Sequence, residues 1–230
     1  MLYEAFLVAL LGMAICLDRV LLQVMISRPI VAAPVIGFLL GDPYTGLIVG
    51  TFLELFWADR LPIGAYIPPN EAIVAVVMTA VAVYAGKQWA SHRQELIALS
   101  ALLVIPMGII GQKTDTLIMK SNDWLAQRAL QDAQNGKSAW ISKGHILSIF
   151  KVMLLYFLII FSGTLLGLAV FLGLVPHIQA SAWQALRILY YILPLIGTAV
   201  ALHVIHARRG VPVFCAVFLV ILIIAQWLQG

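Results

Sequence analysis

The first half of the chain carries polar side chains inside or beside apolar stretches, where an unpaired polar group is costly. Glu54 is the clearest case, since apolar residues flank it in Thr51-Phe-Leu-Glu54-Leu-Phe-Trp57. Asn70 and Glu71 follow two prolines, and Gln112 ends an apolar run. Carboxylates and amides of this kind accept and donate hydrogen bonds to adjacent hydroxyl groups. These residues therefore suit non-covalent binding of a neutral, hydroxyl-rich ligand.

Each of these residues also has a structural interpretation. A carboxylate inside a membrane is a functional candidate because it is costly there, yet Glu54 could instead pair with a neighbouring helix. Trp57 lies three residues further on, and could offer an aromatic face beside Glu54. Asn70 and Glu71 could cap a helix that begins after the prolines. Gln112 could be solvated at a membrane interface.

Three further polar residues complete the candidate set. Asp18 adjoins Arg19 and could form an internal ion pair with it, while Gln23 could be an amide that faces a pore. We place Asp18 and Gln23 among the binding candidates. Asp42 follows a glycine and precedes a proline, which is typical of a turn or a helix cap, so we expect it to have a structural role.

The sequence shows no pattern for catalysis or metal binding. The five histidines have no metal-site spacing with acids or cysteines, and His203 with His206 is better interpreted as an interfacial cluster. Cys16 and Cys215 lie in apolar stretches and are expected to be packing residues. There is no nucleophile elbow and no HExxH motif. We expect no catalytic residue, no metal and no cofactor.

The elements that must hold these polar residues are expected to lie in a lipid bilayer. Hydrophobic residues make up 63% of the 230 positions and charged residues only 10%. Soluble domains carry about 25% charged residues, so this chain lacks the polar surface that water requires. The net charge of +4 is spread between apolar runs, which indicates membrane topology and excludes a nucleic-acid partner.

The C-terminal part has runs long enough to cross a bilayer, which takes about 20 helical residues. We predict spanning helices over roughly 146–173, 184–205 and 211–229. Arg187 is expected near a helix end, where its side chain could reach the interface.

The N-terminal part has shorter apolar runs, broken by Gly, Pro and carboxylates. These runs are 29–41, 43–53, 61–70, 72–86 and 96–112. Runs of this length favour re-entrant hairpins and broken helices, which survive at membrane depth only when protein or a cavity surrounds them. Broken helices commonly form the substrate site of transporters.

Charge divides the chain into three regions of one membrane domain spanning 1–230. All ten acidic residues lie within 1–132, so residues 1–112 are expected to bear the site and residues 144–230 to form a helical scaffold. Residues 113–143 read as a polar loop, with a short amphipathic helix at the membrane surface. The positive-inside rule places this loop and residues 206–209 in the cytoplasm, and residues 174–183 outside.

One ordered set of motifs resembles a known family. Arg28-Pro leads through Leu39-Leu-Gly-Asp42 to Leu53-Glu-Leu and then to Pro62-Ile-Gly-Ala-Tyr-Ile-Pro-Pro-Asn70. Smaller matches stand at 17–19 with Gln23, at 105–106, at 111–112 and at 135–136 with His145. The chain resembles the membrane subunit IIC of the mannose/fructose/sorbose family of bacterial phosphotransferase (PTS) sugar transporters, over most of residues 10–150.

The resemblance implies an all-α, multi-pass permease subunit of the bacterial inner membrane, without catalysis of its own. It implies a sugar path formed with a IID subunit, soluble IIA and IIB proteins that relay phosphate, and a trimer of IIC–IID pairs. The chain departs from the family at Asp59-Arg60, where uncharged residues are usual. A regulatory, non-transporting subunit therefore remains an alternative, as does an ion-coupled transporter with a cation site at Glu54 and Asp42.

Overall fold

The computed structural model describes residues 2–60, 64, 66–136, 139–204 and 212–220, and these parts fold as helices and connecting turns without a β-strand. The helices are α1 (Leu2–Leu17), α2 (Pro29–Leu39), α3 (Pro43–Phe56), α4 (Glu71–Gln88), α5 (Arg93–Val104), α6 (Met107–Gln134), α7 (Ala139–Leu174) and α8 (Ala180–Val204). Short 3₁₀ turns cover Ala90–His92 and Val175–His177. Residues 212–220 are also helical.

The centre of the fold is α4, which is apolar on every side and therefore needs protein around it. It packs against α1, α2, α3, α5 and α7, and 78% of it is buried. We expected its apolar run, 72–86, to be too short for an ordinary span. That expectation was wrong, because Glu71 and Gln88 extend the helix to 18 residues.

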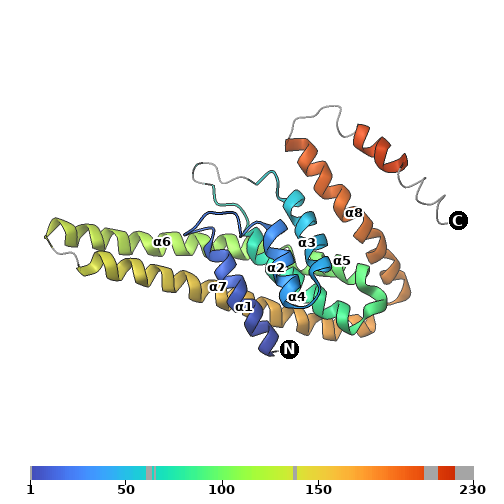
Figure 1. The fold of residues 1–230 in the computed structure, drawn as a ribbon, viewed down its shortest axis with the longest axis horizontal. Coiled ribbons are helices and arrows are strands. Elements are labelled where there is room, and N and C mark those ends of the chain that lie inside the picture. Colours follow the sequence, from blue (N-terminus) through green and yellow to red (C-terminus); the bar gives the residue numbers. More distant parts are fainter. Residues whose placement is uncertain (1, 61–63, 65, 137–138, 205–211, 221–230) are drawn as a thin grey trace.

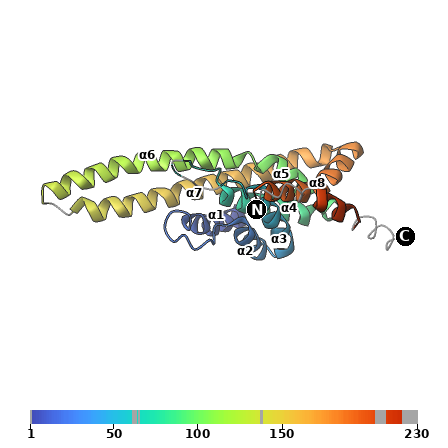
Figure 2. The ribbon, with the colours of Figure 1, turned by 90° about the horizontal axis from the view of Figure 1, so that it is seen from above.

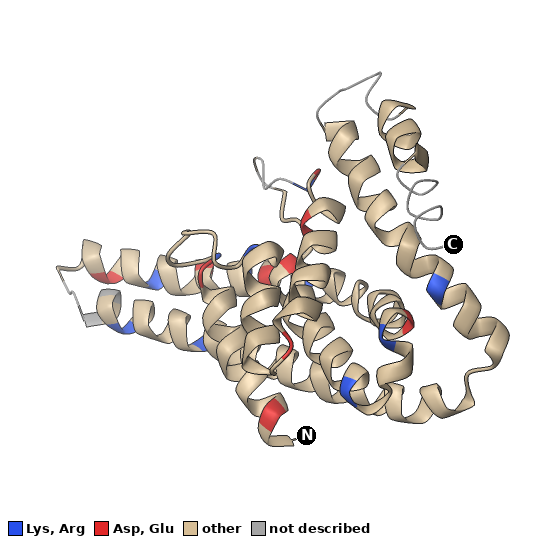
Figure 3. Ribbon diagram, turned by 45° about the vertical axis from the view of Figure 1, so that its right-hand side comes forward, with Lys and Arg blue, Asp and Glu red and all other residues tan. Residues whose placement is uncertain are grey.

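Four helical stretches among the described residues are long and apolar enough to cross a membrane: Glu71–Gln88, Ala90–Gln134, Ser142–His177 and Ala180–Val204. The last two match the spans predicted at 146–173 and 184–205. The third predicted span, 211–229, is helical over 212–220, and its remainder lies outside the described residues, as do residues 206–209. Charged residues are sparse along α4, α7 and α8, whereas the second half of α6 carries several (Figure 3).

Residues 113–143 are not the polar loop that we predicted. Residues 113–134 continue α6 and residues 139–143 begin α7, and the two helices form a long antiparallel hairpin that extends well beyond the other helices (Figures 1 and 2). At 36 residues, α7 is about 54 Å long, against roughly 30 Å for a bilayer core. The polar end of the hairpin therefore has room to stand outside the hydrocarbon.

At the opposite end of the molecule, α8 packs against α3 and α5. The one charged residue of α8 is Arg187, whose side chain pairs inside the protein and does not only extend to the membrane interface. Its guanidinium binds the buried carboxylate of Glu95 on α5, with two nitrogens 2.7 Å from the same oxygen. His92 stacks on Trp183 of α8 at 4.0 Å between ring centroids. These contacts attach α8 to the start of α5.

Candidate functional site

Two short helices, α2 and α3, form a tight hairpin that holds the first candidate residues. At 11 and 14 residues they are about 16 and 21 Å long, too short to cross a bilayer. Glycines allow them to touch: a Cβ on Gly46 would lie 2.4 Å from the carbonyl oxygen of Ala33, and one on Gly50 would lie 2.5 Å from that of Pro29. This is the short, paired-helix structure expected of the N-terminal part.

Asp42 closes the turn of this hairpin as the N-cap of α3. Its carboxylate accepts from the amide of Thr45 at 3.1 Å and from the hydroxyl of Thr45 at 2.7 Å. Arg93 at the start of α5 donates to the same carboxylate. All of these contacts hold parts of the fold together, so Asp42 attaches the α2–α3 hairpin to α5.

Glu54 lies near the end of α3 and faces the start of α2. Its carboxylate pairs with Arg28 and accepts from the amide of Ile30 at 3.3 Å. Arg28 also approaches Glu71 at 3.6 Å. Arg28 therefore joins two of the predicted binding carboxylates, and Glu54 makes the helix-to-helix contact that was its structural alternative.

Asn70 is fully buried where the extended segment before α4 ends. Its side-chain oxygen caps α4 by accepting from the amide of Ile73 at 3.1 Å, and its side-chain nitrogen donates to Asp115 at 3.0 Å. Its backbone amide donates to the carbonyl of Gly108 at 3.0 Å. Asn70 thus caps a helix and also binds a carboxylate on α6.

Gln112 lies one turn before Asp115 on α6. Its side-chain amide donates to the carbonyl of Ile67, which holds the extended segment in front of α4. Gln112 therefore shapes the wall around the candidate site. Trp57 is buried, with its ring against Phe56 and its edge near Gly108, so it does not sit beside Glu54 as an open aromatic face.

Asp18 organises the loop between α1 and α2. Burial disfavours its charged form, but hydrogen bonds from the amides of Val24 and Ser27 and from the hydroxyl of Ser27 outweigh this, and the pKa of Asp18 falls below its ordinary value. Gln23 has a positive φ of 54° and an exposed side chain in the same loop. Neither residue joins the contacts around Asp115.

Asp115 is the residue that sequence reasoning missed. The hydroxyl of Tyr156 on α7 donates to one of its oxygens at 2.9 Å, and Asn70 donates to the other. Arg19, for which a pair with Asp18 was one possibility, lies 4.0 Å from Asp115. The only sequence signal was that Asp115 follows the candidate Gln112 by three residues, which places both near one helix face.

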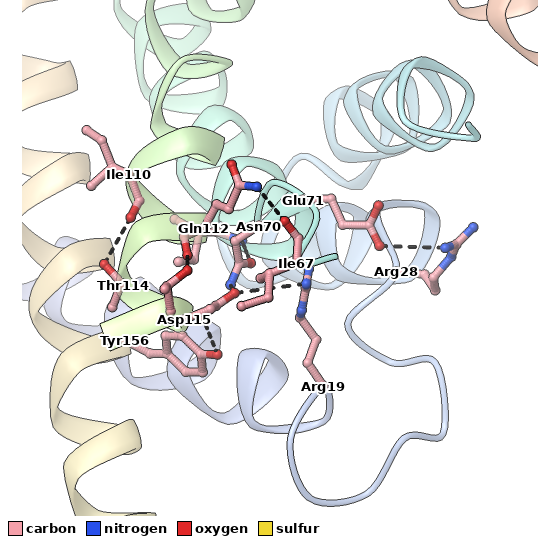
Figure 4. Close-up of polar contacts among 12 residues, drawn as sticks. Arg19, Arg28, Ile67, Asn70, Glu71, Ile110, Gln112, Thr114, Asp115 and Tyr156 are labelled. Atoms are coloured by element: carbon pink, nitrogen blue, oxygen red, sulfur yellow. Dashed lines mark hydrogen bonds and ion pairs between the residues drawn. The ribbon is translucent and has the colours of Figure 1, made fainter. Parts of the chain in front are cut away.

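Several of these residues form a polar band that runs from α7 to the start of α2, and Figure 4 shows its members apart from Glu54. The band is defined by its members: Tyr156, Asp115, Asn70, Arg19, Glu71, Arg28 and Glu54. It draws on α7 as well as on the N-terminal helices.

A cavity of about 330 Å³ opens beside this band. Its lining comes from the α1–α2 loop, the segment before α4, α6 and α7, and comprises Arg19, Val20, Gly64, Tyr66, Ile67, Pro68, Asp115, Ile118, Met119, Asn122 and Tyr156. A hollow of about 450 Å³ between α3 and α8 is larger but almost wholly apolar, and the polar band does not line it. The smaller cavity is therefore the better candidate for a polar ligand. Within the described residues, no cluster of His, Cys, Asp and Glu could hold a metal ion.

The same chain was compared with families of known proteins. Residues 2–228 match the family described as the PTS system sorbose-specific IIC component. The chain belongs to this family. The match confirms the resemblance seen in the motifs and extends it through the C-terminal helices. The chain is accordingly an all-helical, multi-pass protein of the bacterial inner membrane.

Named relatives differ in how much of the chain they match. The mannose-specific EIIC component of Escherichia coli (strain K12) is 30% identical over 139 residues, which is 60% of this chain and 48% of that protein. Over that match, the chain spans about half the length of its mannose-specific relative. N-acetylgalactosamine permease IIC component 1 of the same organism is 26% identical over 94% of this chain and 76% of its own length. The fructose permease IIC component of Bacillus subtilis (strain 168) is 26% identical over 92% and 74%.

Solved structures share the fold. The mannose transporter ManYZ in complex with microcin E492 aligns with a TM-score of 0.63 at 22% identity, over 95% of this chain and 86% of the matched chain. A structure described only as a membrane protein aligns with a TM-score of 0.68, also at 22% identity, over 100% and 91%.

Proposed function

We propose that this IIC-family chain forms a sugar translocation path together with a IID subunit, within a phosphoenolpyruvate-dependent phosphotransferase system. The observation that carries the proposal is the polar band, which brings Arg19, Asp115 and Tyr156 to the wall of a cavity, with Asn70 bonded to Asp115. Polar groups are expensive at membrane depth unless they bind something. A hydroxyl-rich solute that crosses the membrane would be the ligand that these polar groups bind.

The charges of the band favour a neutral ligand. Its two guanidinium groups, on Arg19 and Arg28, face three carboxylates, on Glu54, Glu71 and Asp115. An anionic solute would meet an excess of negative charge, whereas sugar hydroxyls can both donate and accept. Mannose, N-acetylgalactosamine, fructose and sorbose, the sugars for which relatives are named, define the class that we propose.

The ion-coupled alternative has less support. It requires Glu54 and Asp42 to hold a cation, but Asp42 is occupied by Thr45 and Arg93, and Glu54 is paired with Arg28. The unusual Asp59-Arg60 pair bonds within itself at 3.4 Å and reaches the Tyr66 hydroxyl at 3.5 Å. Arg60 thus contacts a residue that lines the cavity, and the pair is compatible with transport.

We infer a partner subunit from the surfaces that this chain leaves exposed. Large apolar side chains on α6, α7 and α8 are exposed, including Ile109, Leu166 and Ile188. Lipid covers such surfaces, but the polar groups at the edge of the band need protein cover. We propose that a IID subunit supplies it, that the pairs assemble as trimers, and that soluble IIA and IIB proteins carry out the phosphate chemistry.

The test is sugar uptake into membrane vesicles that contain the chain with a IID-like partner, supplied with the soluble carriers. Uptake that requires phosphoenolpyruvate and yields sugar phosphate is expected. Uptake driven by an ion gradient without the carriers would support the ion-coupled alternative, and a correctly folded complex with no uptake would support the regulatory one.

A further inference from the structure

Two opposite charges in the cavity, on Arg19 and Asp115, lie too far apart for a direct hydrogen bond. The side chains of Arg19 and Asp115 are 20% and 11% exposed, yet the guanidinium nitrogen lies 4.0 Å from the carboxylate oxygen. Hydrogen bonds between such groups span about 2.7–2.9 Å. The two groups attract each other across a gap that a ligand oxygen could fill.

Arg19 has donors to spare. A guanidinium carries five N–H groups in a fixed fork, and none of those of Arg19 donates a hydrogen bond to another described residue. Burying a charge without hydrogen bonds is expensive. Because Arg19 lines the cavity, its donors are available to a solute that enters there.

Asp115 has acceptor capacity to spare. One oxygen accepts from Tyr156 at 2.9 Å and the other from Asn70 at 3.0 Å, which uses one lone pair on each. These two bonds hold the carboxylate from two sides, on α7 and before α4, and so fix its orientation. A further hydroxyl can still donate to each oxygen.

We propose that Arg19 and Asp115 bind neighbouring hydroxyls of the sugar, with Arg19 donating and Asp115 accepting. Tyr156 and Asn70 are positioning residues that hold Asp115 for this contact. This assignment rests on the proposed sugar transport and adds two residues to its site. A cavity of about 330 Å³ is at the low end of the roughly 300–1,000 Å³ of small-ligand sites, which points to a monosaccharide.

The experiment measures how protein variants that lack one polar group bind sugar analogues that lack one hydroxyl. The complex with its IID-like partner is screened for binding of mannose, fructose, sorbose and N-acetylgalactosamine, and single-deoxy analogues of the best binder are then titrated. The variants are Arg19→Gln and Asp115→Asn. Arg128→Gln is the control, because Arg128 lies far away on the hairpin, over the rings of Trp124 and Trp140.

In the parent complex, removing a contacted hydroxyl should weaken binding about 10-fold or more, because a site built for a hydroxyl rejects its absence. In Arg19→Gln or Asp115→Asn the sugar itself should bind about 10- to 100-fold more weakly, and the penalty for the same deoxy analogue should shrink to less than about 3-fold. Arg128→Gln should keep the full parent profile. Arg19→Lys and Tyr156→Phe provide milder variants should either first variant fold poorly.

This assignment would be overturned if each deoxy analogue lost as much affinity in the Arg19 and Asp115 variants as in the parent. A lower melting temperature alone would then show that the ion pair is purely structural. If Glu54→Gln lost sugar binding in that case, the sugar-transport proposal would stand without it. A folded parent complex that binds none of the four sugars would overturn both.

Discussion

At the scale of single residues, the carboxylates of this protein differ in what they can still bind. Asp42 is held by Thr45 and Arg93 at the turn of a helix hairpin, whereas Asp115 lines a cavity and keeps a free lone pair on each oxygen. Intramembrane position alone does not separate these cases, since all such carboxylates are costly. The contacts of each residue decide whether it holds the fold or faces a ligand.

Asp42→Asn tests the structural half of this distinction. An asparagine can still cap α3, but it loses the charge that attracts Arg93. Since Arg93 is half-exposed, we expect a cost of about 1 kcal/mol. Yield and melting temperature in detergent should fall, while sugar affinity at equal protein concentration should stay at the parent value. A large loss of affinity in a normally stable variant would return Asp42 to the binding site.

At the scale of elements, the α2–α3 hairpin depends on glycine at the helix contact. A Cβ on Gly46 would overlap the backbone of Ala33, and backbone cannot move aside as a flexible side chain can. Gly46→Ala should therefore force the helices apart and destabilise the protein by about 1–3 kcal/mol. Thermal unfolding of the purified complex measures this effect.

Gly144→Ala is the matched control, since nothing lies within 4 Å of a Cβ at that site in α7. It should be neutral or stabilising, by up to about 1 kcal/mol. Equal melting temperatures for the two alanine variants would mean that the hairpin helices are not held at this contact.

The sequence predicted the elements well where length and apolar character decide them. The spans at α7 and α8 and the short helices α2 and α3 follow directly from run lengths and from the Gly and Pro between them. The prediction failed for α4, since a charged residue ended the counted run although a helix can continue through it. It also failed for 113–143, because polar residues do not end a helix when they lie outside the bilayer or, like Asp115, are paired inside the protein.

The candidate site was only partly predictable for a related reason. Asn70, Glu54 and Glu71 stood out because they interrupt apolar runs. Asp115 lies in the more polar part of α6, among lysines and other acids. A carboxylate is ordinary in such a segment, so its sequence context does not mark it as a candidate. Only the tertiary contact with Tyr156, 41 residues away, distinguishes it.

At the scale of the whole molecule, the charge pattern predicts that the far end of the α6–α7 hairpin faces the cytoplasm. Replacing Cys16 and Cys215 and then introducing Gln134→Cys or Ser181→Cys places a single thiol at an exposed position. On the positive-inside argument, an impermeant thiol reagent should label Ser181→Cys in intact cells and Gln134→Cys only after permeabilisation. Labelling in the opposite order would invert the topology.

The measurement that tests the central claim most directly is sugar binding to the complex of this chain with its IID-like partner, comparing the parent with Asp115→Asn. Asparagine keeps the shape of the side chain but removes its charge, and losing one charge-assisted hydrogen bond should weaken sugar binding about 10- to 100-fold. Asp123→Asn, an exposed carboxylate on α6, should leave it unchanged. Parent-like binding by Asp115→Asn at equal expression would show that Asp115 is structural, and would contradict the placement of the sugar in the cavity beside the polar band.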